Sequence, residues 1–234
     1  MQLSKRLAAI AKMVKNGNRV VDVGCDHGYI PIWLVEQGVI PGAIAMDINK
    51  GPLLRAEANI EQHNLSCYIE TRLSDGVAAL GAGEGDTLVI AGMGGPLMER
   101  ILEEGADVLR TIQEFILEPQ SEIGHMRLYL QEHGYEITDE DMVFEDGKFY
   151  PVIKAVHGSM KPLKGEELEY GSCLLEKQHP ILYRYLKHEL DGAQRLSQEL
   201  MKVQSTGAAR RMDEIRQKIE LISLALKYYE TKNI

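Results

Sequence analysis

The first residues suited to ligand chemistry are Asp22, Gly24, Cys25 and Gly28, which surround a sharp turn between a β-branched run and an apolar helical pattern. Glycine at 24 and 28 would let a ligand approach the backbone with no Cβ in the way. The free N–H groups at the start of the following helix would favour a carboxylate or a phosphate. Many tight strand-to-helix turns share this Gly-x-x-x-Gly spacing, so the other strand ends must decide whether a ligand binds here.

Asp47 closes a second apolar run, 23 positions after Gly24. A carboxylate at this offset can accept hydrogen bonds from both hydroxyls of a ribose. Dehydrogenases that bind NAD and methyltransferases that bind S-adenosylmethionine share the offset, and an ordinary helix-capping acid is the alternative. We assign the adjacent Ile48 to the same cofactor site.

Asp75 and Gly76, after the third expected strand, separate these two classes. An aspartate there can accept a hydrogen bond from an adenine amino group while the next backbone N–H donates to a ring nitrogen. Methyltransferases commonly bind the adenine of their cofactor in this way, and a simple turn aspartate is the alternative. A nicotinamide dehydrogenase is disfavoured because the chain has no Gly-x-Gly-x-x-Gly.

The segment Gly92-Met93-Gly94-Gly95 follows the fourth run, where the target atom meets the methyl group in such folds. Its three glycines leave space for a flat base, and their carbonyl groups can accept the amino protons of that base. Met93 can pack on the base or simply fill the core, as most methionines do.

Asp26, His27 and Tyr29 lie beside the first turn. Tyr29 can stack on a base, although a half-buried tyrosine is an equally good interpretation. His27 can orient the turn through a hydrogen bond, and Asp26 or a carbonyl near Gly92 can accept from an amino group on the base. The histidines form no metal-binding pattern, and the chain has neither a P-loop nor Gly-x-Ser-x-Gly.

The elements that must position these residues alternate along the first two thirds of the chain. We expect parallel strands, each followed by a helix or a loop, over residues 19–23, 43–46, 68–72, 87–91 and 115–117. The intervening helices are expected over 31–37, from 51 to 63, up to Glu104, and over 121–133. Strands 143–145 and 149–156 flank Asp146-Gly147, a hairpin signal. The pattern predicts an open, mostly parallel sheet covered on both faces, with ligands outside the carboxyl ends of the strands.

Two helical segments flank this sheet in the sequence. Residues 3–15 form an amphipathic, basic helix. After a linker at 161–165, the segment 165–234 is expected to be an antiparallel helical hairpin in coiled-coil style. Its expected apolar seam consists of Leu182, Leu186, Leu190, Ala193, Leu196, Leu200 and Val203, then Ile215, Ile219, Ile222, Leu226 and Tyr229. Gln204–Ala208 interrupts it, with Gly207 as the helix breaker.

Composition limits the classes further. The 234 residues are 44% hydrophobic, and no apolar run is long enough to cross a bilayer. The net charge of −9 is uneven: residues 1–20 carry +5, residues 21–160 carry −16, and residues 161–234 carry +2. Basic ends on an acidic body can still bind a phosphate backbone, although solvated helix faces are the plainer interpretation of the C-terminal part. Three scattered cysteines and the lack of a signal-peptide pattern favour the cytoplasm.

Several motifs together resemble the bacterial TrmK family. They are Leu3-Ser4-Lys5-Arg6-Leu7, Asp22 to Pro31 (DVGCDHGYIP), Lys50-Gly51-Pro52, Ser74-Asp75-Gly76, Ile90 to Gly95 (IAGMGG) and Glu145 to Tyr150 (EDGKFY). The resemblance spans the whole chain. It implies a Rossmann-like class I methyltransferase sheet with a C-terminal coiled-coil hairpin. It also implies methylation of N1 of adenine 22 in tRNA by S-adenosylmethionine.

The resemblance also assigns roles to individual residues. It implies a cofactor site made of Asp22, Gly24, Cys25, His27, Gly28, Asp47, Ile48, Asp75, Gly76 and Gly92. Catalytic positions beside the target base would be Asp26, Tyr29 and Met93, and tRNA contacts would come from Lys5, Arg6, Gly94 and Gly95. We expect no metal and favour a monomer.

Three departures from the family pattern bear on the site. Cys25 and Gly28 stand where we expect serine and alanine, and Asp47 stands where glutamate is frequent. Glu118-Pro119-Gln120 replaces the usual Gln-Pro-Asn, which leaves the roles of Glu118 and Gln120 open. A carboxylate at Glu118 near RNA phosphate would be unfavourable unless it were protonated or turned away.

Two other functions remain open at this stage. One is a methyltransferase acting on a small molecule or a protein, with the C-terminal hairpin as a dimerisation device. The other is a non-catalytic module that keeps the cofactor pocket as a ligand sensor.

Overall fold

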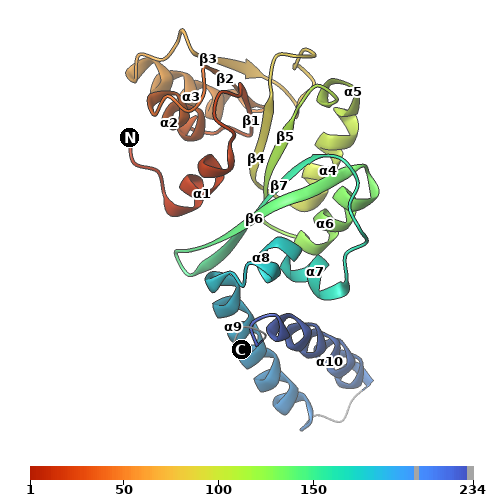
Figure 1. The fold of residues 1–234 in the computed structure, drawn as a ribbon. Coiled ribbons are helices and arrows are strands. Elements are labelled where there is room, and N and C mark those ends of the chain that lie inside the picture. Colours follow the sequence, from red (N-terminus) through yellow and green to blue (C-terminus); the bar gives the residue numbers. More distant parts are fainter. Residues whose placement is uncertain (203–205, 231–234) are drawn as a thin grey trace. The chain divides into compact units, whose positions relative to one another are not determined.

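The computed structural model describes residues 1–202 and 206–230 (Figure 1). Contacts divide the chain into two compact units, Met1–Lys161 and Pro162–Ile234. The first unit contains the sheet and its helices, and the described part of the second unit is helical.

Within the described residues, the first unit is built on a seven-stranded sheet of order β3-β2-β1-β4-β5-β7-β6 (Figure 1). The strands are β1 (Val20–Val23), β2 (Ala43–Asp47), β3 (Ile69–Leu73), β4 (Thr87–Met93), β5 (Glu114–Pro119), β6 (Tyr135–Glu145) and β7 (Lys148–His157). The first five strands, in the sheet order β3-β2-β1-β4-β5, pair in parallel. Strand β7 pairs antiparallel with both β5 and β6. This confirms the predicted mostly parallel sheet with a final hairpin. The strand order reverses between β1 and β4, where open α/β sheets bind their ligands.

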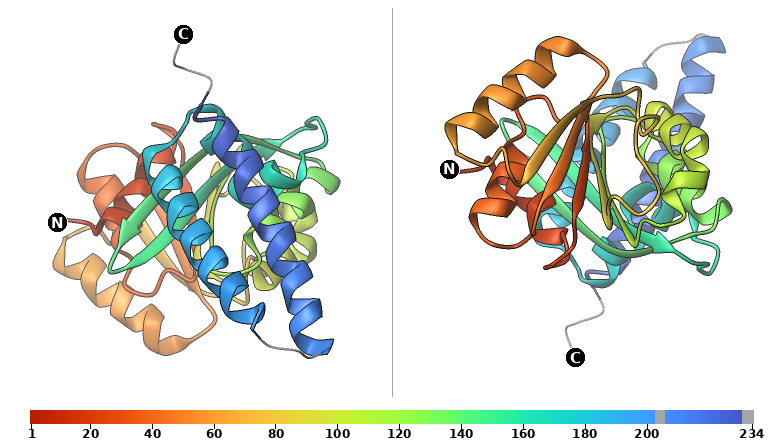
Figure 2. Two further views of the ribbon diagram at one scale, coloured as in Figure 1. Left: turned by 90° about the horizontal axis from the view of Figure 1, so that it is seen from below. Right: turned by 90° about the horizontal axis from the view of Figure 1, so that it is seen from above.

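Helices cover both faces of the sheet (Figures 1 and 2). One face carries α1 (Lys5–Met13), α2 (Tyr29–Glu36) and α3 (Lys50–Gln62). The other carries α4 (Gly95–Glu104), α5 (Ala106–Leu109) and α6 (Ile123–Glu132). Ile10, Ile32 and Ile60 are buried beneath the first set, and Met98 and Leu102 beneath the second. Such double coverage explains why the parallel strands read as continuous apolar runs.

Several predicted boundaries were wrong. Strand β4 continues through Gly92 and Met93, which were expected to follow it. Helix α2 begins at Tyr29 and not at Pro31, because Gly28 takes the left-handed conformation at its N-cap and the proline lies in the first turn, where it breaks no helical hydrogen bond. Strand β5 continues through Glu118 and Pro119, which were expected to follow it. Strand β6 begins at Tyr135 and not at 143.

Helix α1 is fixed at both ends by carboxylates from the sheet. Glu145 accepts hydrogen bonds from the backbone N–H groups of Lys5 and Arg6, at 2.7 and 3.2 Å. Beyond the other end of the helix, Glu114 accepts from the Lys15 N–H at 2.7 Å. An anion at a helix N-terminus also interacts favourably with the helix dipole. The predicted amphipathic helix is therefore held against β5, β6 and β7, and its first turn has a fixed place.

The second unit contains α7 (Gly165–Tyr170), α8 (Ser172–Glu176), α9 (Pro180–Leu200) and α10 (Thr206–Lys227). Helices α9 and α10 run antiparallel: Lys218 pairs with Glu189 in the middle, and the Tyr229 hydroxyl donates to the His179 carbonyl oxygen at the base, at 2.9 Å. None of the helices in the described ranges is long and apolar enough to cross a membrane.

The predicted seam between α9 and α10 is partly correct. Its buried members are Leu182, Leu186, Ala193, Ile215 and Ile222. The assignment of Leu196 to the seam was wrong, since this side chain is 37% exposed. Gly207 is not the breaker, because it lies inside α10. Val203 and Gln204 fall outside the described residues.

Candidate active site

A cavity of about 500 Å³ opens at the carboxyl ends of β1 and β4. Its walls come from the first turn of α1, the β1–α2 turn, the end of β4 and the tip of the β6–β7 hairpin. The size lies within the range of small-molecule sites, about 300–1,000 Å³. This is the position at which the strand order predicts a ligand.

The cavity brings together eight of the residues singled out in the sequence. They are Arg6, Asp22, Gly24, Cys25, Asp26, His27, Tyr29 and Gly92. The remaining candidates do not line it: Lys5, Gly28, Asp47, Ile48, Asp75, Gly76, Met93, Gly94 and Gly95. Most of these lie on neighbouring strand ends, and Asp75 and Gly76 line a separate, smaller hollow beside α4 and α5.

The β1–α2 turn is shaped for close approach to its backbone. Gly24 has a φ of +76°, and a Cβ on it would stand 2.3 Å from the Met93 Cε atom. The N–H groups of Gly24 and Cys25 both donate to the Met46 carbonyl oxygen, at 2.8 and 3.0 Å, which fixes the turn. Met93 therefore lies against the glycine turn rather than on the cavity wall.

Asp22 is a buried acid on the cavity wall. It is only 4% exposed, and within residues 1–202 and 206–230 no group donates a hydrogen bond to its carboxyl. Burial, and secondarily the negative charge of Asp47, raises the pKa of Asp22 to about 7. A buried acceptor of this kind suits a cationic group of a ligand. Asp47 itself is buried at the end of β2 and accepts from the Asn49 N–H at 2.8 Å.

The residues after Gly24 form the exposed rim. Asp26 is paired with Arg55, with 2.6 Å between Oδ1 and Nη2, so its charge is already compensated. The rings of His27 and Tyr29 stack, 5.0 Å apart and 8° from parallel. Tyr29 is 40% exposed, which leaves ring surface available for an incoming base. That Asp26 accepts a hydrogen bond from the amino group of that base stays a prediction.

The end of β4 contains a bulge at Gly92, where the register with β5 shifts between Ala91 and Met93. Gly92 has a φ of +79°, and a Cβ there would stand 2.8 Å from Arg6 Nη2. Arg6 forms an ion pair with Glu118 at 3.0 Å, which answers the question left by the sequence: the Glu118 carboxylate is turned toward Arg6. Burial raises the pKa of Glu118, and the neighbouring Arg6 opposes this shift.

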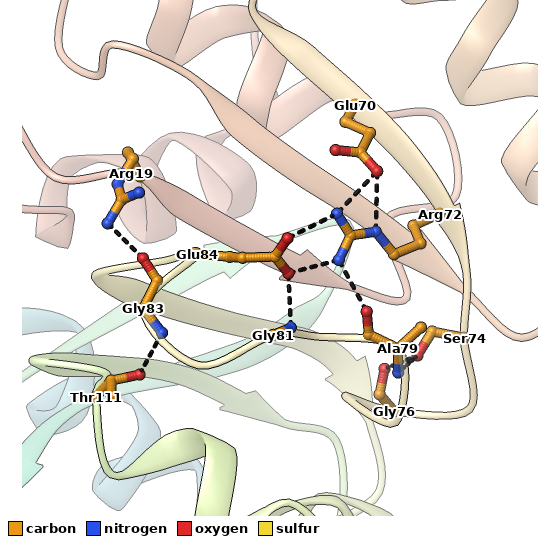
Figure 3. Close-up of polar contacts among 10 residues, drawn as sticks. All are labelled: Arg19, Glu70, Arg72, Ser74, Gly76, Ala79, Gly81, Gly83, Glu84 and Thr111. Carbon is orange, nitrogen blue, oxygen red and sulfur yellow. Dashed lines mark hydrogen bonds and ion pairs between the residues drawn. The ribbon is translucent and has the colours of Figure 1, made fainter.

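The loop after β3 is held by its own polar network (Figure 3). Arg72 pairs with Glu70 and Glu84 and donates to the Ala79 carbonyl oxygen at 2.8 Å. The Ser74 hydroxyl donates to the Gly76 carbonyl oxygen at 2.9 Å, which closes the turn. These contacts give the predicted adenine-binding segment a defined shape. Arg100 Nη2 lies 3.0 Å from Asp75 Oδ1, so this carboxylate already has one partner.

The β6–β7 hairpin also contributes to the cavity, which was not predicted from the sequence. Glu145, Asp146 and Tyr150 line the cavity together with Ser4. The Asp146-Gly147 signal located the turn, and pairing of Glu145 with Lys148 confirms the hairpin. Nothing in the local pattern indicated that the hairpin tip reaches the end of β1, because that proximity depends on the strand order.

Comparisons with known proteins agree with this geometry. A family model described as a methyltransferase domain matches residues 3–153. The tRNA (adenine(22)-N(1))-methyltransferase of Bacillus subtilis is 32% identical over 228 residues, which cover 95% of this chain and 96% of that protein.

Two solved structures with bound molecules are also similar. A Streptococcus pneumoniae protein in complex with S-adenosyl-L-methionine has a TM-score of 0.85 and 35% identity, covering 96% of this chain and all of that one. The M. capricolum TrmK structure in complex with S-adenosyl-homocysteine has a TM-score of 0.83 and 27% identity, covering 97% and 99% of the two chains.

Proposed function

This chain belongs to the family of tRNA (adenine(22)-N(1))-methyltransferases, and we propose that it transfers a methyl group from S-adenosylmethionine to N1 of adenine 22 in tRNA. The observation that carries the proposal is the cavity between the Gly24 turn and Gly92, at the point where the strand order reverses. We place the activity in the cytoplasm, where tRNA is found, and we favour a monomer.

The residues present fit the cofactor. The buried Asp22 carboxyl would accept from its ammonium group, and the Gly24–Cys25 turn would hold its methionine end. Asp47 and Ile48 would contact the ribose, and Asp75 and Gly76 the adenine. When bound, S-adenosylmethionine supplies a methyl carbon made electrophilic by the adjacent sulfonium.

Adenine N1 carries its own lone pair, so the protein needs no strong general base. Its task is to exclude water and to hold the base in line with the methyl carbon. Tyr29 would stack on the base, and the Gly92 carbonyl oxygen or Asp26 would accept from the N6 amino group. Adenine 22 lies in the folded D-arm and must be exposed or flipped out, which costs a few kcal/mol. Contacts from the basic helix α1 and from the α9–α10 hairpin would offset that cost.

Incubation of the protein with S-adenosylmethionine and unmodified bacterial tRNA, followed by nucleoside mass spectrometry, tests the proposal. We expect N1-methyladenosine. Cofactor binding without any methylated nucleoside would contradict the proposal and favour another methyl acceptor. Cofactor binding with no turnover on any acceptor would favour a ligand sensor.

Cofactor affinity should depend on pH through Asp22. Its carboxyl is neutral below its raised pKa and charged above it, and only the charged form attracts the cationic cofactor. The affinity should therefore rise by up to about tenfold per pH unit between roughly pH 5 and pH 7. Calorimetric titration of the wild type and of Asp22→Asn checks this, because the variant should bind weakly with a nearly flat pH profile. A wild-type affinity that does not change with pH would contradict this role.

In the absence of cofactor, the Asp22 carboxyl makes the folded protein less stable as the pH rises. The folded protein retains the Asp22 proton in a range where the unfolded chain has lost it, so this contribution to stability falls as the pH rises from about 4 to about 7. Thermal melts without cofactor at neutral pH should therefore show Asp22→Asn at least as stable as the wild type.

Binding of tRNA should weaken with salt. Residues 1–20 carry a charge of +5, and the exposed face of α10 includes Arg210, Arg211 and Arg216. If the protein neutralises about three phosphates, the release of their counterions should weaken tRNA binding by about tenfold or more when the salt concentration rises from about 50 to about 200 mM. Filter binding at several salt concentrations measures this slope. An unchanged affinity over that range would exclude phosphate contacts as the main source of binding.

A further inference from the structure

Glu118 is a buried carboxylate beside the cavity, only 1% exposed, near the end of β5. Within the described residues, its Oε2 atom accepts from Arg6 Nε at 3.1 Å and from the Gly92 N–H at 2.8 Å. Its Oε1 atom accepts from Gln120 Nε2 at 2.6 Å. One side chain therefore joins helix α1, the end of β4 and the end of β5.

The contact with Gly92 replaces a missing bond of the sheet. The ladder between β4 and β5 pairs Ala91 with Glu118 and Met93 with Pro119, and it skips Gly92. Gly92 is exposed, so outside the ladder its N–H has only solvent or a side chain as a partner. The Glu118 carboxylate supplies the acceptor, and charge-assisted bonds of this kind are stronger than neutral ones. The bulge, and with it the direction of the Gly92 carbonyl, depends on this side chain.

The contact with Arg6 orders the facing wall. The Arg6 guanidinium lies over the Tyr150 ring, 5.3 Å from its centroid, while two of its nitrogens bond to Glu118. Both Arg6 and Tyr150 line the cavity. Glu118 thus fixes an edge of the cavity on the β4 side and, through Arg6, an edge on the hairpin side. Its charge also compensates that of Arg6, so the predicted contact between Arg6 and tRNA phosphate would compete with this pair.

We propose that Glu118 is a positioning residue for methyl transfer: by holding the Gly92 N–H and the Arg6 guanidinium together, it sets the place where the target base is held. The inference rests on the proposed function, since the base that it positions is the tRNA adenine. Glu118 does not itself line the cavity and touches no reacting atom.

Glu118→Gln and Glu114→Gln form a matched pair of variants. Glu114 is also buried on β5, accepts from the Lys15 N–H and the Thr87 hydroxyl, and pairs with Lys154 at 2.7 Å. Glu114 also fixes the α1 segment, but it lies at the start of β5, whereas Glu118 lies near the end of the same strand. The glutamine amide keeps one acceptor oxygen and turns an NH₂ group toward some of the former donors, so each variant loses part of its network while keeping its size.

We expect Glu118→Gln to lower kcat on tRNA by about 10- to 100-fold, because small displacements of a reacting group cost rate steeply. The rate is counted per cofactor-binding site, so a partly unfolded sample does not imitate the effect. Affinity for S-adenosylmethionine should stay within about twofold of the wild type, and KM for tRNA should not rise, because Arg6 is released rather than removed. Glu114→Gln should lose thermal stability but keep kcat.

A second readout needs no turnover. The Gly92 amide proton, bonded to a carboxylate, should resonate downfield in ¹⁵N-labelled wild type and move upfield in Glu118→Gln, but not in Glu114→Gln. Equal kcat values for the two variants, or an unmoved Gly92 resonance, would overturn the inference. A wild type that binds cofactor but methylates no tRNA would instead refute the proposed function, and the Gly92 resonance would still test whether Glu118 holds this turn.

Discussion

Replacing Gly24 with alanine is expected to weaken S-adenosylmethionine binding by about 10- to 100-fold, since an L-residue at this backbone conformation costs roughly 1–2 kcal/mol and the turn that lines the cavity should relax away from it. Gly24 has a φ of +76°, and the added Cβ would stand 2.3 Å from the Met93 Cε atom. The flexible Met93 can move aside, so the fold should survive. The turn that would bind the methionine end of the cofactor should lose its shape. Calorimetric titration with S-adenosylmethionine measures the loss.

Gly38→Ala is the matched control. Gly38 also has a positive φ, +66°, but nothing lies within 4 Å of its hypothetical Cβ, and it does not line the cavity. The same backbone strain should therefore lower its melting temperature while its cofactor affinity stays at the wild-type value. Equal cofactor affinity in Gly24→Ala and the wild type would show that the turn does not form the binding site.

Glu140→Ala is expected to lower the free energy of unfolding by about 3–5 kcal/mol, because it removes a carboxylate that pairs with a buried guanidinium. Arg127 in α6 and Glu140 in β6 are both almost fully buried, with 2.8 Å between Nε and Oε1. Arg127 is also among the largest fully buried side chains of the described chain. Urea denaturation monitored by circular dichroism at neutral pH gives the value.

The double variant Arg127→Met, Glu140→Met separates the charge effect from loss of packing. Apolar replacement of a whole buried pair is often neutral, or stabilising by about 1–4 kcal/mol, so the double variant should recover most of the stability lost in Glu140→Ala. A double variant less stable than the single one would mean that the pair stabilises the fold by more than mutual compensation.

The sheet and the first turn of the site could be predicted because they depend on local patterns. A β-branched run around Asp22 and an apolar run ending in Asp47 identify buried parallel strands, and the glycines after Asp22 identify the turn. Strand β6 was mostly missed for a physical reason. A register shift between Ile137 and Asp139 breaks its alternation, and the buried Glu140 occupies a position where a hydrophobic residue is expected.

The other site residues that could not be predicted depend on contacts between residues far apart in the sequence. Glu118 bonds to Arg6, which precedes it by 112 positions, and no local pattern connects them. Tyr150 reaches the cavity only because β7 inserts between β5 and β6. The assignments of Asp75 and Gly76 to the cofactor adenine stay predictions, since these residues lie outside the cavity formed by Asp22 and Gly92.

The central claim is that the cavity beside Gly24 and Gly92 serves methylation of one tRNA adenine. Its most direct test uses two unmodified transcripts of the same tRNA that differ only in adenine or guanine at position 22. Each is incubated with the protein and S-adenosylmethionine, and the modified nucleotide is mapped by mass spectrometry of nuclease fragments. The account predicts N1-methyladenosine at position 22 of the first transcript and no methylation of the second. Equal methylation of both transcripts, or of neither while the cofactor binds, would contradict it.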